Sequence, residues 1–302
     1  MDRIDHLSLR DLRLLVTLAE RRHFARTAAE FDLSQPTLSA TIKKIETAFG
    51  APLFERSARR VALTTEGESV VRQAYVVLQE ATRLAETLRP SDEPLTGRFR
   101  LGVFPTLAPY LFPVILEPLQ TAYPQLQLIL TEAITEELLR QLRTRQLDGV
   151  ILALPQGAAD LAIYPLFREA FWLAVGAQHP LADKASLTID DVPLEELLLL
   201  EPGHCLRDQV LTACGTGFLA HRRAVHAAGL ETQLVMVAAG MGVAIVPNLA
   251  TKRPHPGVCY LPFSSPSPGR DLALVIRQTG QDPRDAQSLT AFLRRSIEKS
   301  EV

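Results

Sequence analysis

The sequence predicts an all-α head at the N-terminus, a long linker helix and a C-terminal α/β domain. Apolar residues before Gly50 recur at spacings of three and four, which is the period of an α-helix. One apolar stripe at nearly heptad spacing follows. Beyond Gly97, short apolar runs alternate with helical stretches, as they do in α/β proteins.

Composition limits the classes of protein. The 302 residues suffice for two or three domains, and 47% hydrophobic with 22% charged residues fits a globular chain. No apolar run approaches the roughly 20 residues of a membrane span, and the N-terminus lacks the apolar stretch of a signal peptide. We therefore expect a cytoplasmic protein without a membrane partner. Three cysteines are too few for a secreted disulfide framework, and nothing indicates a metal or another cofactor.

Charge is unevenly distributed along the chain. Residues 1–64 contain 11 Lys and Arg against 8 Asp and Glu, whereas the remainder contains 21 against 26. A basic head on an acidic body is typical of a DNA-binding domain attached to a domain that does not bind DNA. The difference is small, and the pattern of residues within the head is the stronger support.

The first fifty residues have the pattern of a helix-turn-helix. Apolar residues from Leu9 to Ala19 form one buried stripe of a first helix, and a second short helix is expected at residues 27–31. A third helix follows, in which Ser34 caps the N-terminus and Pro36 stands in the first turn, where a missing N–H costs nothing.

A wing and a recognition surface complete this head. Alternation at Val61 and Leu63 predicts a short strand pair with an arginine-bearing tip. The third helix has the length to enter a major groove, and Gln, Ser and Thr on its outer face can contact base edges. Lysine and arginine side chains bind phosphates, and the candidates are Lys43, Lys44, Arg56, Arg59 and Arg60. The alternative is that these are ordinary solvated residues.

Residues 66–89 are predicted to form one long helix. Its apolar stripe consists of Val70, Ala74, Val77, Ala81, Leu84 and Leu88. Two interpretations remain open: the helix packs on its own domain, or it forms a dimer through the narrow stripe. Residues 90–94, which begin and end with proline, are expected to be a hinge between domains.

The remainder has an α/β pattern. Strands are expected at residues 99–103, 126–130, 149–154, 171–175, 196–200, 243–246 and 271–276, and helices at 113–123, 136–145, 230–239 and 284–299. This alternation favours parallel sheets. About 200 residues with this pattern can form two linked subdomains with a ligand-binding cleft between them.

The segment around Cys205 has the composition of a reactive thiol site. His204 and Arg207 are cationic neighbours, and the preceding Pro-Gly pair favours a helix N-terminus, so we expect a lowered thiol pKa. A thiolate attacks peroxide and becomes a sulfenic acid. If residues 205–214 are helical, Cys205 and Cys214 lie roughly 13–14 Å apart along the axis. A disulfide needs Cα atoms about 4.4–6.8 Å apart, so bond formation must unwind the helix.

The alternative for this pair is two unrelated buried cysteines, since free cysteine is among the most buried residue types. The third thiol, Cys259, lies in the apolar run from Gly257 to Leu261, where we expect it to pack in the core.

The head closely resembles the DNA-binding head of the LysR-type regulators. The matching segments are Leu9–Leu12, Ala19–Phe24, Ala28-Ala29, Leu33–Ser39, Leu53–Arg56 and Val61–Thr64. The likeness continues through the chain, because that family has a linker helix and two α/β subdomains in this order.

This resemblance implies a winged helix-turn-helix at residues 1–65, a linker and dimerisation helix at 66–92 and a regulatory domain at 93–302. The regulatory domain would consist of two periplasmic-binding-protein-like subdomains, about 93–168 with 272–302 and about 169–271. A homotetramer is implied, assembled as a dimer of dimers, that binds promoter DNA and contacts RNA polymerase as an activator. By position, the base-contacting and wing residues are Gln35, Pro36, Thr37, Ser39, Arg56 and Arg59.

The regulatory domain is similar to the peroxide-responsive branch of this family. The matching segments are Gly203–Gln209 with Cys214, Phe104–Thr106, Pro109-Tyr110, Glu132–Thr135, Leu230–Thr232 and Val237–Gly242. The resemblance implies that Cys205 is the peroxidatic cysteine and Cys214 the resolving one. It also implies that hydrogen peroxide is oriented by Thr106, Thr135, His204, Gln209 and Arg270.

Each of these orienting residues also has a structural interpretation. Thr106 can be a loop cap, Thr135 a helix N-cap and Arg270 a surface charge. Residues 215–226, which follow Cys214, depart from the pattern of the branch, so refolding of this segment stays open.

Three functions are consistent with the residues. The first is a regulator of oxidative-stress genes that senses hydrogen peroxide through a Cys205–Cys214 disulfide. The second is a LysR-type regulator that binds a small organic effector in the cleft, with incidental cysteines. The third is an enzyme in which His204 activates Cys205, and it is disfavoured because adjacent residues rarely place their side chains for proton transfer.

Overall fold

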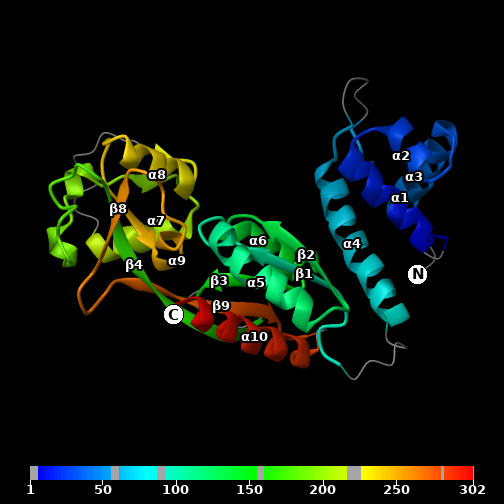
Figure 1. Ribbon diagram of the computed structural model, residues 1–302. Helices are drawn as coiled ribbons and strands as arrows, with labels where there is room; N and C mark the ends of the chain where they lie inside the picture. Colours follow the sequence, from blue (N-terminus) through cyan, green and yellow to red (C-terminus); the bar gives the residue numbers. More distant parts are fainter. Residues whose placement is uncertain are drawn as a thin grey trace. The chain divides into compact units, whose positions relative to one another are not determined.

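A computed structural model describes residues 6–55, 61–86, 93–154, 160–215, 226–279 and 282–301. The chain divides into two compact units, Met1–Pro90 with Thr144–Gln146 and Ser91–Arg143 with Leu147–Val302. Figure 1 shows the elements of each.

The first unit is a small helical head followed by a long helix. It contains α1 (Leu9–Arg21), α2 (Phe24–Glu30), α3 (Gln35–Phe49) and α4 (Thr65–Glu86). Each of the first three begins at a side chain that accepts a backbone N–H bond, as N-caps do. The fully buried side chains include Leu15, Leu18, Leu38, Ile45 and Leu53, so the predicted inward stripes form one core.

The turn between α3 and the wing is fixed by one carboxylate. Glu46 Oε1 accepts from the backbone N–H groups of Leu53 and Phe54, at 2.8 and 3.3 Å. Phe54 then pairs with Leu63 in an isolated antiparallel bridge, which is the base of the predicted wing. The predicted tip, with Arg56 and Arg59, lies outside the described residues.

The apolar side chains of helix α4 lie in two environments. Val71 and Ala74 are buried in the core of the head, whereas Val77 and Leu84 are 40% and 74% exposed. The N-terminal part of α4 therefore packs on its own head, as one interpretation expects. The C-terminal part leaves apolar side chains free to pack elsewhere, as the other expects.

The second unit is built around a seven-stranded sheet. Its strands are β1 (Gly97–Val103), β2 (Leu126–Glu132), β3 (Gly149–Ala153), β4 (Leu161–Gly176), β7 (Ala244–Pro247), β8 (Val258–Pro262) and β9 (Gly269–Arg277). The order is β2-β1-β3-β9-β4-β7, with β8 also paired to β4. A separate parallel pair consists of β5 (Leu199–Leu200) and β6 (His226–Ala227).

Two strands connect the two halves of this unit. β4 pairs with β9 through residues 161–170 and then with β7 and β8 through residues 171–176. Figure 1 shows β4 running from the half with β1–β3 to the half with β8. The described helices are α5 (Ala108–Ala122), α6 (Thr135–Arg143), α7 (Cys205–Cys214), α8 (Leu230–Ala238), α9 (Asn248–Thr251) and α10 (Pro283–Glu301). None of the described helices combines the length and apolarity of a membrane span.

A side-chain contact also joins the two halves. Tyr110 on α5 donates a hydrogen bond to Glu231 on α8 at 3.0 Å. Burial and the adjacent carboxylate raise the pKa of Tyr110. The phenol therefore keeps its proton for this bond.

The structure corrects several sequence predictions. β1, β2 and β3 are parallel as expected, but β9 is antiparallel to β3 and β4, so the sheet is mixed. β4 begins ten residues before the predicted 171–175, because Pro165 and a bulge break its apolar alternation. α5 begins at Ala108 and continues through Pro113, where a helix start was expected. The predicted strand at 196–200 is reduced to β5.

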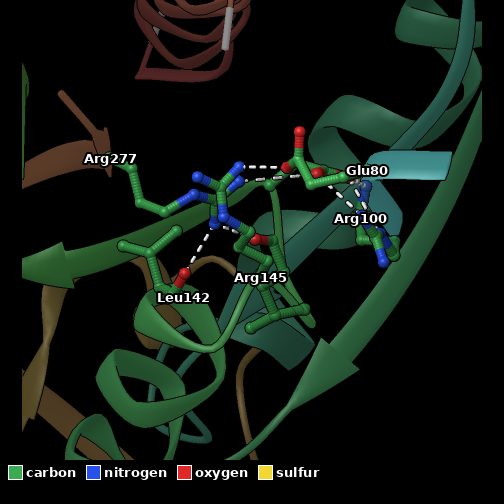
Figure 2. A network of polar contacts seen from close by, with 7 residues as sticks. Glu80, Arg100, Leu142, Arg145 and Arg277 are labelled. Atoms are coloured by element: carbon green, nitrogen blue, oxygen red, sulfur yellow. Dashed lines mark hydrogen bonds and ion pairs between the residues drawn. The ribbon is translucent and has the colours of Figure 1, made fainter. Parts of the chain in front are cut away.

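A buried arginine closes the C-terminal end of α6 against β9. Arg277 Nη1 donates to the carbonyl oxygens of Leu142 and Leu147, at 2.5 and 2.6 Å. Figure 2 shows Arg277 pointing toward Leu142, with Arg100 nearby. Asp148 accepts from Arg100 Nε at 2.9 Å. The last carbonyls of a helix lack partners within it, and Arg277 supplies the missing donor.

Arg277→Met should lower the free energy of unfolding by about 2–4 kcal/mol, because two buried carbonyls lose their donor. Urea denaturation of the full chain measures the change. The matched control is Arg284→Met, since Arg284 is 59% exposed and pairs with Asp282 at the surface. The control should change stability by no more than about 0.5 kcal/mol. Equal effects of the two substitutions would contradict this assignment.

Candidate functional site

A small pocket lies where three loops of the second unit meet. The loops follow β1, β2 and β5, and each leads into a helix: α5, α6 and α7. Ligand sites in α/β proteins commonly form at the carboxyl ends of strands, where helix N-termini point inward. The lining residues are Phe104, Pro105, Thr106, Ile134, Thr135, Gly203, His204 and Cys205.

Cys205 is the first residue of α7 and lies in this pocket. Gly203 turns the chain at φ +100°, a conformation that residues with a side chain rarely adopt. His204 is the N-cap of α7, and its Nε2 lies 3.1 Å from the carbonyl oxygen of Ala228. This turn places a partly buried thiol at a helix N-terminus.

Arg270 lies behind the pocket in a fully buried ion pair. Its Nη2 is 2.7 Å from Glu169 Oε2, and both side chains are 1% exposed. Arg270 Nη1 donates to Thr106 Oγ1 at 3.1 Å, and Nη2 donates to the Thr106 carbonyl oxygen at 3.2 Å. The guanidinium also lies 4.9 Å from the centre of the Phe104 ring, within the range of a cation–π contact. The interpretation of Arg270 as a surface charge is therefore wrong.

Burial raises the pKa of Cys205 above its ordinary value. The positive charge of Arg270, a hydrogen bond from the Thr135 hydroxyl and the N–H groups of Leu206 and Cys205 act in the opposite direction. The expected lowering of the pKa is therefore wrong, because the loss of hydration outweighs the favourable contacts. Arg207 turns away, and its Nη1 donates to the Leu200 carbonyl oxygen at 2.7 Å.

Cys214 is the last residue of α7, as the helical interpretation of residues 205–214 requires. Nine residues of helix separate the two cysteines by roughly 13–14 Å along the axis. Burial raises the pKa of Cys214 to about 11. Both thiols therefore stay protonated near neutral pH, and they cannot form a disulfide while α7 is intact.

The pocket gathers four of the predicted site residues, namely Thr106, Thr135, His204 and Cys205. Arg270 lies one contact behind them, bonded to Thr106. Gln209 is one turn further along α7 and does not line the pocket; its Oε1 is buried without a hydrogen-bond partner among the described residues. Cys259 lies on β8, partly buried against the core.

The exposed face of α3 carries the DNA-binding candidates that are described. Gln35, Pro36, Thr37, Ser39 and Lys43 are all exposed. Thr37 Oγ1 lies 2.8 Å from Ser34 Oγ, so the cap fixes this side chain at the helix N-terminus.

Lys44 differs from Lys43 because it forms an ion pair with Asp11 of α1 at 2.9 Å. Its charge is already paired within the head, which makes it a weaker phosphate-binding candidate than the sequence suggested.

Glu169, the buried partner of Arg270, was not among the residues predicted from the sequence. Glu169 lies in the part of β4 that hydrophobic alternation did not predict. A charged residue there carries no local signal, because only the pairing of β4 with β9 places it opposite Arg270.

Comparison with known proteins agrees with this architecture. Residues 9–68 match the bacterial regulatory helix-turn-helix protein, lysR family, and residues 92–298 match the LysR substrate binding domain. The chain therefore belongs to the LysR family of bacterial regulatory proteins.

Within that family, the chain is similar to proteins named for hydrogen peroxide. It is 42% identical over 273 residues to the hydrogen peroxide-inducible genes activator of Dickeya chrysanthemi, covering 90% of each chain. The DNA-binding transcriptional dual regulator OxyR of Escherichia coli has the same identity and coverage. A full-length OxyR variant from Pseudomonas aeruginosa superimposes with a TM-score of 0.76 at 38% identity, covering 97% of this chain and 95% of that one.

The partly buried thiol of Cys214 should react slowly with iodoacetamide. Raising its pKa from 9.0 to about 11 leaves about a hundredfold less thiolate at pH 8. The measurement uses the full chain with Cys205→Ser and Cys259→Ser, so that Cys214 is the single thiol. The same chain in urea is the control and should react about a hundredfold faster. Equal rates in the folded and unfolded chain would contradict burial of this thiol.

Proposed function

We propose that this protein is a transcriptional regulator that senses hydrogen peroxide through Cys205 and Cys214. The observation that carries the proposal is the placement of Cys205 in a pocket with the hydroxyls of Thr106 and Thr135. Relatives named hydrogen peroxide-inducible genes activators support a response to hydrogen peroxide. The protein would control genes that respond to oxidative stress.

The proposed reaction has two steps. The Cys205 thiolate attacks one oxygen of hydrogen peroxide, the O–O bond breaks, and the sulfur loses two electrons to give a sulfenic acid and hydroxide. Hydroxide takes a proton and leaves as water. The thiolate of Cys214 then attacks the sulfenic sulfur, the S–O bond breaks, and the disulfide forms; the departing hydroxide takes a proton and leaves as a second water.

Donors around the pocket suit the first step. In the transition state one peroxide oxygen bonds to sulfur while the other becomes hydroxide, so donors and positive charge must meet the leaving oxygen. Thr106, Thr135, His204, Gln209 and Arg270 are the residues that we propose for this role. Thr106 supports it best, because it lines the pocket and is bonded to the buried cation Arg270.

The second step would convert oxidation into a change of shape. Because the disulfide and α7 exclude each other, at least part of the helix must unwind. Leu206 and Val210, which α7 buries in the core, would lose their packing. The bond from Arg207 to the Leu200 carbonyl oxygen, which anchors the first turn of α7, would also change if that turn unwinds.

The output would be a change in DNA binding by the head. We propose that residues 1–65 bind promoter DNA through Gln35, Pro36, Thr37, Ser39, Lys43, Arg56 and Arg59. Residues 66–92 would join two chains, and the exposure of Val77 and Leu84 on α4 supports this. The regulatory domain would span residues 93–302 and complete a homotetramer that contacts RNA polymerase.

The cysteine chemistry would be stoichiometric sensing and not enzymatic turnover, since the relatives are regulators. A regulator of promoters acts where the bacterial chromosome lies, so we place the protein in the cytoplasm.

Peroxide should remove two thiols together. Titrating the reduced full chain with one equivalent of hydrogen peroxide should join Cys205 to Cys214, because the sulfenic acid is trapped by the second thiol. Counting free thiols and mapping the disulfide by mass spectrometry measure this. Cys259→Ser is the matched control and should leave the reaction unchanged, whereas Cys205→Ser should abolish it.

Two results would decide against the peroxide switch. One is a promoter response to peroxide that persists in Cys205→Ser. The other is metabolite-dependent DNA binding in the Cys205→Ser, Cys214→Ser double variant, which would favour a small organic effector in the LysR substrate binding domain.

Lys43→Ala should weaken binding to mixed-sequence duplex DNA and make it less sensitive to salt. Loss of one phosphate contact reduces the slope of log K against log salt by about 0.9. Fluorescence anisotropy at several salt concentrations measures this slope. Lys44→Ala is the matched control and should change the slope less, because Lys44 is paired with Asp11. The same change in slope for both variants would contradict the assignment of Lys43.

A further inference from the structure

Glu169 is held in register with the cation behind the pocket. It lies on β4 directly opposite Arg270 on β9. Both side chains are 1% exposed, so neither charge is compensated by water. A buried charge of this kind is costly unless it is paired and hydrogen-bonded, and the two residues supply this to each other.

The hydrogen bonds of the pair fix the guanidinium from two sides. Arg270 Nε donates to Glu169 Oε2 at 2.8 Å, and the other carboxylate oxygen accepts from the Leu249 N–H at 3.0 Å. On its other side the guanidinium donates to the hydroxyl and the carbonyl oxygen of Thr106. Glu169 is thus anchored to the backbone, and it holds the planar fork of Arg270 against Thr106.

This arrangement determines what Thr106 can do. A hydroxyl has one proton to donate and two lone pairs that accept. Arg270 Nη1 occupies one lone pair of Thr106 Oγ1, at 3.1 Å. The hydroxyl proton is then left to be donated, and Thr106 lines the pocket that holds Cys205. A cation that donates to the oxygen also makes that proton a stronger donor.

We propose that Glu169 is a positioning residue for the peroxide reaction, acting through Arg270 to direct the Thr106 hydroxyl at the bound oxidant. The proposal rests on the peroxide-sensing function proposed above. Glu169 itself would not contact peroxide. Its contribution is to hold Arg270 so that Thr106 is oriented before the oxidant arrives, which is how preorganised donors act on a transition state.

Orientation and charge can be separated by two reagents. Iodoacetamide reports the amount of thiolate at Cys205 and needs no oriented donor for a leaving oxygen. The reaction with hydrogen peroxide needs both the thiolate and an oriented donor for the leaving oxygen. Glu169→Gln removes the negative charge that neutralises Arg270, the cation that favours the Cys205 thiolate. It also places an amide NH2 group, which cannot accept a hydrogen bond, opposite either Arg270 or the Leu249 N–H. The two rates should therefore diverge.

The experiment uses the full chain with Cys214→Ser and Cys259→Ser, so that Cys205 is the single thiol. Sulfenic acid formation with hydrogen peroxide is followed at pH 7 by dimedone trapping, and alkylation by iodoacetamide is followed at the same pH. Glu169→Gln should slow the peroxide reaction about tenfold or more. It should leave the rate of alkylation unchanged or raised.

A double-mutant cycle with Thr106→Val tests the path of the effect. If Glu169 acts through Thr106, then Glu169→Gln slows the peroxide reaction in the parent but changes it by less than about twofold in the T106V background. Two independent contributions would instead multiply. The near-UV circular dichroism of Trp172, the single tryptophan, monitors the folding of β4 in each variant.

Glu169→Asp keeps the carboxylate and provides the conservative comparison. It should retain more of the peroxide rate than Glu169→Gln. If Glu169→Gln does not fold, Glu169→Asp replaces it in the double-mutant cycle with Thr106→Val. Three results would overturn the proposal. The Glu169 variants could react with peroxide as fast as the parent, or the effects of the Glu169 and Thr106 substitutions could multiply. The rates with peroxide and with iodoacetamide could also fall by the same factor. A parent that reacts with peroxide no faster than its urea-unfolded chain would instead overturn the proposed function itself.

Discussion

The buried ion pair of Glu169 and Arg270 is the constraint on which the regulatory unit depends. The two residues lie on β4 and β9, the strands that run between its halves, and each would be destabilising without the other. Their register fixes where Arg270 meets Thr106, and Thr106 in turn belongs to the loop that ends β1. The loop over the pocket is therefore tied to the central strands by polar contacts that tolerate little displacement. If the pocket orients a molecule as small as a peroxide, as proposed, it needs this rigidity.

The thiols are under a different constraint, because burial suppresses their ionisation. Cys205 and Cys214 both have raised pKa values, so little thiolate is present at neutral pH. Reactivity toward one oxidant must then come from oriented donors in the pocket and not from a generally activated thiol. For the proposed sensor this combination favours selectivity, since a reagent that cannot use those donors encounters a protonated, partly buried sulfur.

Much of the fold could be predicted from local pattern, whereas the electrostatics of the site could not. Ser34 and Pro36 mark the start of α3 because capping and proline preferences act within one turn. The helix between the two cysteines was considered from the sequence only as a condition, and the structure shows it as α7. The first half of β4, the antiparallel course of β9 and the partner of Arg270 depend on pairing between residues a hundred positions apart. The pKa of Cys205 was predicted in the wrong direction for the same reason, because burial is set by distant segments and its sequence neighbours Arg207 and His204 bond elsewhere.

Helix α7 joins the two constraints into one mechanism. Its N-terminus supplies the backbone N–H groups that stabilise the Cys205 thiolate, and its length keeps Cys214 out of reach. In the proposed switch, the helix that assists the first oxidation would therefore prevent the second step until it unwinds. Unwinding would take Leu206 and Val210, if they lie in the part that unwinds, out of the core, and unwinding at the N-terminus would remove the N–H groups that supported the thiolate. The two covalent states of the proposed switch would then correspond to two packings of this segment. Two discrete packings would let oxidation act on DNA binding by shifting the population from one to the other.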